Sequence, residues 1–151
     1  APNSYSAYYN RANVKSELKD KYGAIIDYDK SIKINPNNSD AYNNRGWEKF
    51  ELKNYNEALK DINIAIQLDS TNAIAWDSRQ EIKFNLKDYK GCISDCNIAL
   101  SLDPNMSNVY FYRGRAYYRL GNKKQACNDW SKAGELGNSQ AYEYISKYCQ
   151  N

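Results

Sequence analysis

The stretch that decides the fold runs from residue 40 to residue 72 and reads DAYNNRGWEKFELKNYNEALKDINIAIQLDSTN. Its first half has helical spacing of apolar and small residues, which Lys53-Asn54 interrupts. Its second half carries one apolar stripe at helical spacing, made of Ala58, Ile62, Ala65 and Ile66. The polar run at 69–72 supplies side chains that cap a following helix. The stretch therefore predicts two antiparallel helices joined by a short turn.

The same pattern recurs along the chain at intervals of 34 residues. An aromatic residue opens each copy, at Tyr8, Tyr42, Trp76 and Tyr110. A small residue marks the second helix of each copy, at Ala24, Ala58, Cys92 and Ala126. Four copies in one register predict a repeat array, in which each unit buries its apolar stripe against its neighbours instead of around one globular core.

A 34-residue period with these residues resembles the tetratricopeptide repeat family. The family pattern is matched by the aromatic start, by Gly46 and Gly114, by the small residues of the second helices, and by Pro36 and Pro104. The resemblance covers about residues 5–140. It implies an all-α fold, a right-handed α-superhelix of nine antiparallel helices.

The register predicts the domain boundaries. We expect a disordered leader at residues 1–4, four repeats, and a C-terminal capping helix at 139–151. The four repeats are expected at 5–38, 39–72, 73–106 and 107–140. The last helix has an apolar face that would cover the open end of the array, which a solenoid needs for solubility.

A second pattern follows the repeat. Arginine stands at Arg11, Arg45, Arg79 and Arg113, and aspartate follows sixteen residues later at Asp27, Asp61, Asp95 and Asp129. Two interpretations are open: a row of ligand-binding arginines, or a ladder of ion pairs between the helices of each repeat. We favour the ladder, because the pattern has the period of the packing.

The sequence contains no histidine, and we predict neither catalysis nor a metal or cofactor. The absence of histidine removes histidine-dependent triads and most zinc sites. Cys92 and Cys96 fall in core registers, and we interpret them as small buried residues, the alternative being a thiolate pair. A disulfide between Cys127 and Cys149 is possible if the last helix folds back, and the sequence leaves this open.

The charge and the hydropathy of the sequence limit the classes of partner that we expect. The net charge is +3 with both signs mixed, which does not favour nucleic acid. No run of about 18 apolar residues occurs, so we expect no membrane span. We expect a monomer. The chain starts without Met, so we expect a trimmed N-terminus and leave the compartment open, with the cytoplasm as the default.

The resemblance implies that one stripe of each first helix lines a concave groove that binds a protein or peptide. We expect this groove to be lined by Tyr9, Asn13, Asn43, Trp47, Phe50, Asp77, Glu81, Phe84, Phe111, Arg115, Tyr118 and Arg119. Trp47 is the expected anchor, because central tryptophans often carry the energy of protein interfaces.

The family's clamp for acidic chaperone tails fits poorly. The chain supplies Asn13 and Asn44, but it has Tyr9, Ile74 and Ser78 where the clamp needs cations and their partner.

Two alternatives to a natural binding module stay open: an engineered binder on a repeat scaffold, and a self-assembling spacer. The engineered alternative rests on departures from the pattern at Trp47, Glu48 and Gln80 without visible compensation in the sequence.

Overall fold

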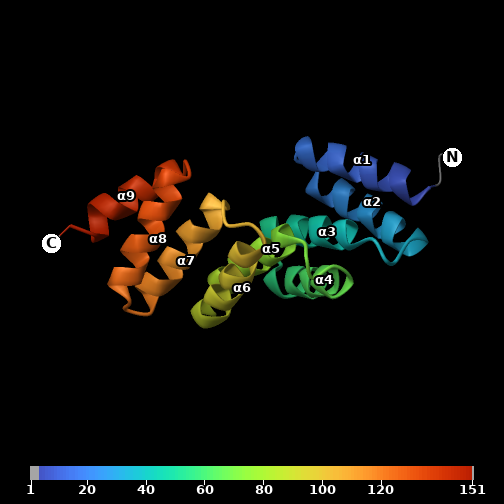
Figure 1. The fold of residues 1–151 in the computed structure, drawn as a ribbon. Helices are drawn as coiled ribbons and strands as arrows, with labels where there is room; N and C mark the ends of the chain where they lie inside the picture. The colour runs from blue at the N-terminus through green and yellow to red at the C-terminus, as the bar shows by residue number, and fades with distance from the viewer. Residues whose placement is uncertain (1–3, 151) are drawn as a thin grey trace. The chain divides into compact units, whose positions relative to one another are not determined.

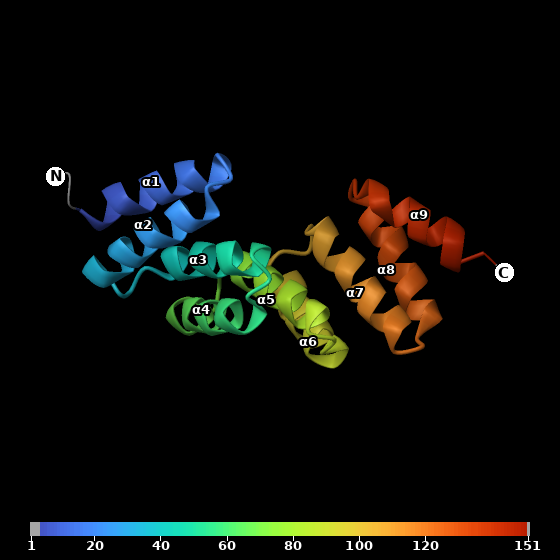
Figure 2. The same cartoon turned by 180° about the vertical axis from the view of Figure 1, so that it is seen from behind.

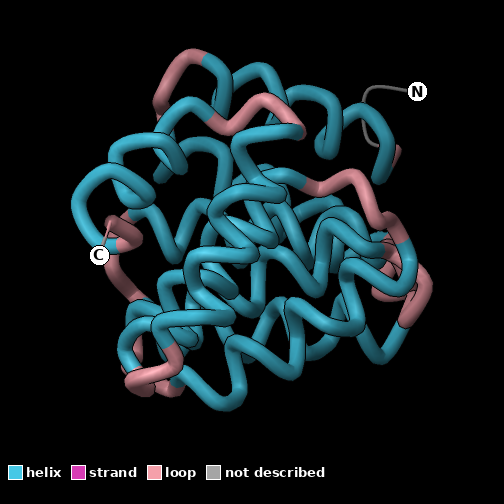
Figure 3. Tube along the Cα trace, turned by 60° about the vertical axis from the view of Figure 1, so that its left-hand side comes forward, coloured by secondary structure: helices cyan, strands magenta, loops and turns pink. Residues whose placement is uncertain are grey.

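The computed structural model describes residues 4–150, and this part of the chain folds into helices joined by short loops (Figures 1 and 3). The helices are α1 Tyr5–Glu17, α2 Lys21–Ile34, α3 Ser39–Glu51, α4 Tyr55–Leu68, α5 Ala73–Asn85, α6 Tyr89–Leu102, α7 Ser107–Arg119, α8 Lys123–Glu135 and α9 Ser139–Tyr148. No strand occurs within residues 4–150. The expected all-α class is confirmed. Most of the expected leader, residues 1–3, lies outside the described residues, and Ser4 is the N-cap of α1.

The chain divides into two compact units, the first ending at Ser78 and the second beginning at Arg79. The division falls within α5, so the first half of this helix belongs to the first unit. The first unit holds the pairs α1–α2 and α3–α4, which are visible from both sides in Figures 1 and 2. The second holds α6 to α9.

The turns inside the repeats share one backbone conformation. Lys19, Lys53 and Lys87 each have a φ of 63 to 65°, and Gly121 stands at the same register with a φ of 84°. This left-handed conformation ends the first helix and turns the chain back, a task that favours glycine. Three of the four repeats thus have lysine at a position where the left-handed backbone conformation is strained for a residue with a side chain.

Helices cross closely within each repeat because the volumes of two facing side chains are matched. A Cβ on Gly46 would lie 2.8 Å from Cδ1 of Ile62, and a Cβ on Gly114 would lie 2.7 Å from Nε1 of Trp130. The third repeat reverses this arrangement with a large residue on the first helix, Gln80, which is fully buried.

The two buried cysteines compensate for Gln80. The Oε1 atom of Gln80 accepts from Sγ of Cys92 at 3.3 Å and from Sγ of Cys96 at 3.5 Å. Cys96 occupies the register of Ile62 and Trp130 and leaves the room that Gln80 fills. Both cysteines are free thiols with a packing role, as interpreted from the sequence. The large side chain of Gln80 is therefore compensated by the two cysteines, and this departure from the family pattern does not require an engineered origin.

The ladder of ion pairs is present in every repeat. Each arginine donates from Nε and Nη2 to the two carboxylate oxygens of its aspartate, at 2.6 to 2.8 Å, in the pairs Arg11–Asp27, Arg45–Asp61, Arg79–Asp95 and Arg113–Asp129. All four aspartates are buried, at most 7% exposed, so the arginines neutralise charges that would otherwise be unpaired in the core.

Lysines at the same register of three repeats add a second cation to this ladder. Lys15, Lys49 and Lys83 lie 2.7 to 2.8 Å from the aspartates of the first three repeats. In the fourth repeat, Tyr117 stands at this register, and among the described residues Arg113 is the cation that pairs with Asp129.

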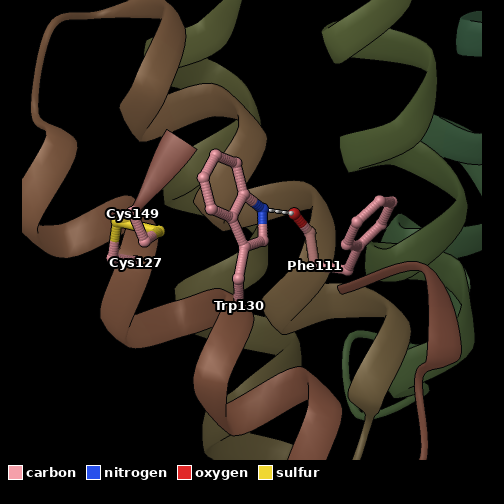
Figure 4. The surroundings of a disulfide bond; sticks show 4 residues. All are labelled: Phe111, Cys127, Trp130 and Cys149. Carbon is pink, nitrogen blue, oxygen red and sulfur yellow. Dashed lines mark hydrogen bonds between the residues drawn. A yellow bond between two sulfur atoms is a disulfide. The ribbon is translucent and has the colours of Figure 1, made fainter. Parts of the chain in front are cut away.

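The last helix closes the second unit through aromatic packing and a disulfide. Tyr144 and Tyr148 of α9 pack against Trp130, which is fully buried and donates from Nε1 to the carbonyl oxygen of Phe111 at 3.2 Å. Cys127 of α8 and Cys149, the C-cap of α9, form a disulfide beside this cluster (Figure 4). The structure thus decides the pairing that the sequence left open.

Candidate peptide-binding site

The first unit contains a pocket of about 400 Å³. It is lined by Asn13, Ser16 and Glu17 of α1, Tyr28 of α2, Asn43, Asn44, Trp47 and Glu48 of α3, and Ile74, Asp77 and Ser78 of α5. Three successive first helices of the repeats therefore contribute to one hollow.

Small polar side chains at packing registers create this hollow. Ser16 and Asn43 stand at the registers that carry Phe84 and Phe111 two repeats later. Both phenylalanines are buried and fill the space between their helices. Because a serine and an asparagine are much smaller, the same face of the first unit is open.

Trp47 forms an aromatic wall of the pocket. Its ring packs on Phe50 with 5.0 Å between the centroids, and Phe50 in turn packs on Tyr55 at the turn of the repeat at 5.6 Å. Phe50 is buried, whereas Trp47 is only partly buried. The indole is therefore held in place from behind while part of its surface faces the pocket.

A hydrogen-bonded network fixes the polar side of the pocket. The Tyr28 hydroxyl donates to Oδ1 of Asn13 at 2.7 Å, and Nδ2 of Asn44 donates to the same oxygen at 3.3 Å and to the Tyr9 hydroxyl at 3.2 Å. Burial raises the pKa of Tyr28 well above its usual range, so this phenol stays a neutral donor.

Two buried polar side chains border the pocket. Glu48 is 4% exposed and accepts a hydrogen bond from the Ser16 hydroxyl. Asn43 is 6% exposed; its Nδ2 donates to Oδ1 of Asn44 at 3.3 Å, but its own Oδ1 is buried without a hydrogen-bond partner in the structure. An unpaired acceptor of this kind is rare in a folded protein.

The second unit presents a different arrangement at the equivalent repeat position. Arg115, which corresponds to Trp47, lies over the rings of Phe84 at 4.3 Å and Tyr112 at 4.9 Å. The Tyr112 hydroxyl donates to Glu81, and burial is the main reason that the pKa of Tyr112 is raised above its usual range.

A smaller hollow of about 210 Å³ lies next to Arg115 in the second unit. It is lined by Arg115, Tyr118, Arg119, Trp130, Tyr144 and Tyr148. With two arginines and no acid among these described lining residues, it is opposite in charge to the first pocket.

The structure places the expected groove residues in three groups. The first pocket brings together Asn13, Asn43, Trp47 and Asp77, and the second hollow brings together Arg115, Tyr118 and Arg119. Tyr9 and Glu81 contact these groups through Asn44 and Tyr112 respectively. The remaining three, Phe50, Phe84 and Phe111, do not present an open surface.

The prediction that these three phenylalanines line a groove needs correction, because they are 3 to 9% exposed. Phe50 and Phe84 pack on the turn aromatics Tyr55 and Tyr89, at 5.6 and 5.4 Å, and Phe111 packs on Tyr144 at 4.9 Å. Large aromatic side chains at these registers reach into the interface with neighbouring helices. Asn43 is equally buried, although it borders the pocket.

Ser16, Asn44 and Glu48 are pocket residues absent from the predicted set. Glu48 carried a signal in the sequence, because Val14, Ile82 and Ala116 stand at its register in the other repeats. The contact between Ser16 and Glu48 joins two repeats and has no signal in either repeat alone.

Residues 4–150 contain neither a metal-binding cluster nor a membrane-spanning helix. In this part of the chain, no cluster of three or more histidine, cysteine or acidic side chains is arranged to hold a metal ion. No helix described here is both long and apolar enough to cross a bilayer.

The comparisons with known proteins agree on one family. Three tetratricopeptide repeat models match the chain, at residues 5–38, 27–60 and 108–136. No curated protein shows significant sequence similarity to the chain.

Three solved structures illustrate the likeness in fold. The crystal structure of MamA has a TM-score of 0.84 at 20% identity, with 93% of this chain and 82% of MamA covered. The Arabidopsis OM64 TPR domain has a TM-score of 0.75 at 25% identity, covering 77% and 96% of the two chains. The first TPR of Spaghetti (RPAP3), solved with the HSP90 peptide SRMEEVD bound, has a TM-score of 0.72 at 26% identity, covering 74% and 90%.

Proposed function

This chain belongs to the tetratricopeptide repeat family, and we propose that its first unit binds a peptide segment of a partner protein in the pocket beside Trp47. The fold is that of a protein-interaction module, and a similar structure holds a bound peptide. The observation that carries the proposal is the partly exposed Trp47 at the wall of a pocket of about 400 Å³.

The shape and chemistry of the pocket support a side chain of the partner as its occupant. An aromatic wall, a set of amides fixed by hydrogen bonds and a volume of about 400 Å³ combine apolar area with oriented polar groups, as ligand sites do. Because Trp47 is supported by Phe50, it needs little ordering when a partner binds.

We propose binding without catalysis. The chain lacks histidine, the side chain that most often activates a serine hydroxyl, and we assign the hydrogen bond from Ser16 to Glu48 at the pocket a structural role. The buried ion pairs use the arginines inside the repeats, so they hold the scaffold together instead of contacting a partner.

The experiment is a paired measurement on two tryptophans of the first unit. A library of random peptides is selected against the chain, and the selected peptides are titrated against Trp47→Ala and Trp76→Ala. Trp76 donates from Nε1 to the carbonyl oxygen of Ser70 at 2.9 Å and does not border the pocket, so it is the matched control.

We expect Trp47→Ala to weaken peptide binding at least about thirty-fold, roughly 2 kcal/mol, with a small change in melting temperature. Trp76→Ala should mainly lower the melting temperature. Peptides that bind Trp47→Ala as tightly as the parent would place the site elsewhere. Mass that grows with concentration in light scattering, with no selected peptide, would favour the self-assembling spacer.

A further inference from the structure

We infer that the pocket beside Trp47 selects an arginine side chain of the bound segment, with Glu48 as the counter-ion. The inference rests on the proposed function, since it names the side chain that this pocket takes. It concerns which side chain the pocket prefers, and this preference can be disproved while peptide binding itself stands.

The first step is the exceptional position of Glu48 among the buried acids. Of the carboxylates buried within residues 4–150, the four ladder aspartates each bind an arginine. Glu48, 4% exposed, has a hydroxyl donor from Ser16 and no cation at salt-bridge distance among the described residues. A buried carboxylate is costly unless a cation or several hydrogen bonds compensate it, so Glu48 has unused capacity for a cationic donor.

The second step is the neighbouring amide. Oδ1 of Asn43 is buried without a hydrogen-bond partner, and Asn43 lies on the same helix as Glu48 and borders the same pocket. The unpartnered oxygen of Asn43 and the carboxylate of Glu48 are both acceptors. These acceptors favour an inserted group that brings hydrogen-bond donors over a carboxylate or a phosphate.

The third step is the charge of the lining. Besides Glu48, the carboxylates of Glu17 and Asp77 border the pocket, and none of the described residues that line it is basic. The field in the pocket is negative, and it favours a cation while repelling acidic tails. Trp47 adds an aromatic face against which a cation is attracted by the ring quadrupole.

The fourth step is an arrangement inside the molecule itself. In the second unit, the residue that corresponds to Trp47 is Arg115, and its guanidinium lies 4.3 Å from the centre of the Phe84 ring and 4.9 Å from that of Tyr112. The same face of the repeat can therefore hold a guanidinium among aromatic rings. In the first unit the aromatic residue is present, and the cation is left for the partner to supply.

Arginine fits this set better than lysine. A guanidinium offers five donors in a plane, so one side chain can donate to Glu48 and still have donors for a second acceptor while its flat face stacks on an indole. An ammonium is a compact and strongly hydrated charge without a planar face.

The test uses two small probes in place of an unidentified partner. N-acetyl-arginine methylamide and its neutral isostere, N-acetyl-citrulline methylamide, are titrated against the chain, and the Trp47 indole and Asn43 side-chain amide signals are followed by NMR. We expect saturable shifts of both signals with the arginine probe, affinity at least about tenfold weaker with citrulline, and an intermediate affinity with the lysine analogue.

Glu48→Gln is the decisive variant, because glutamine keeps one acceptor oxygen for Ser16, removes the negative charge and replaces the other oxygen by an amide group. It should fold as stably as the parent and lose the preference for arginine over citrulline. Glu57→Gln is the control, since Glu57 is an exposed acid of α4 that pairs with Lys60 and is not among the residues that line the pocket. It should leave the preference unchanged.

The outcomes separate the two proposals. If selected peptides depend on Trp47 but tolerate replacement of every basic residue, peptide binding stands and the arginine inference is wrong. Equal binding of lysine and arginine probes, or an unchanged preference in Glu48→Gln, also overturns it. If no peptide depends on Trp47, the proposed function itself fails.

Discussion

Arg45 and Asp61 face each other across α3 and α4 through two parallel hydrogen bonds, from Nε to Oδ2 at 2.8 Å and from Nη2 to Oδ1 at 2.6 Å. Nη1 of the same arginine donates to Asp29 of α2 at 2.6 Å. One guanidinium therefore ties together helices of two repeats. Its side chain is 15% exposed and that of Asp61 is 5% exposed, so water screens the contact poorly.

Replacing a ladder arginine should destabilise the chain, and the cost should depend on the repeat. Asp61 keeps Lys49 at 2.7 Å after Arg45→Leu, whereas Asp129 has Arg113 as its one cationic partner among the described residues. We expect losses of about 1–2 kcal/mol for Arg45→Leu and about 3 kcal/mol for Arg113→Leu, because the second leaves a buried carboxylate without a cation. Urea unfolding of both variants measures the difference; equal losses would contradict the role given to Lys49.

The dependence of stability on pH should be confined to acid. The hydrogen bonds from Arg11 are the main reason that the pKa of Asp27 is lowered to about 2, from an ordinary value near 3.8. Since the folded-state pKa is the lower one, this stabilisation is present above about pH 4 and is lost as the pH falls toward about 2. For Asp27 alone it amounts to about 2 kcal/mol.

Between about pH 5 and 8 the melting temperature should stay constant, because a chain without histidine has no side chain that ordinarily titrates there. Thermal melts from pH 8 down to pH 2 check both the constant melting temperature above about pH 5 and its fall in acid. The Asp27→Asn variant should lose part of the acid-dependent change. A melting temperature that moves strongly between pH 7 and 6 would mean that a perturbed group has been overlooked.

Reduction of the disulfide should loosen the last helix. The bond closes a loop between residues 22 apart in sequence, for which chain entropy gives about 3 kcal/mol. We expect the free energy of unfolding to fall by about that amount when a reductant is added, and equally in Cys149→Ser without reductant. Cys92→Ala is the control, because it removes a free thiol and keeps the disulfide between Cys127 and Cys149. Its free energy of unfolding should therefore still fall when the reductant is added. If the free energy of unfolding of the parent protein does not change when the reductant is added, the aromatic contacts of α9 are sufficient to hold it in place.

The matched volumes at the helix crossings should appear as coupling between two sites. Gly114→Ala should cost about 1–3 kcal/mol, because the new methyl group would lie 2.7 Å from Nε1 of Trp130 in a packed core. Adding Trp130→Tyr recreates the alanine and tyrosine that stand at these registers as Ala12 and Tyr28 in the first repeat. In a double-mutant cycle, the double variant should be at least about 1 kcal/mol more stable than the sum of the two single effects predicts. If the two effects are strictly additive, the volumes of these side chains are not matched to each other.

The sequence alone determined the repeat, the positions of the helices and the pairing of arginine with aspartate. These features are local or strictly periodic: a stripe at helical spacing defines a helix, and a pair that recurs every 34 residues must meet in the same way in each repeat. Helix starts are local in the same way, since the side chains of Asp20, Asn38, Asp88 and Asn138 accept from backbone N–H groups at the starts of α2, α3, α6 and α9.

Only the tertiary structure decided which residues of the first helices remain open. The spacing that puts Phe50 and Trp47 on one face does not tell that Phe50 turns toward Tyr55 while Trp47 keeps a free surface. The pocket depends on side-chain volume at contacts between different repeats, such as Ser16 with Glu48, and the disulfide depends on α9 folding back onto α8. Contacts of this kind do not follow the period, so no register in the sequence could reveal them.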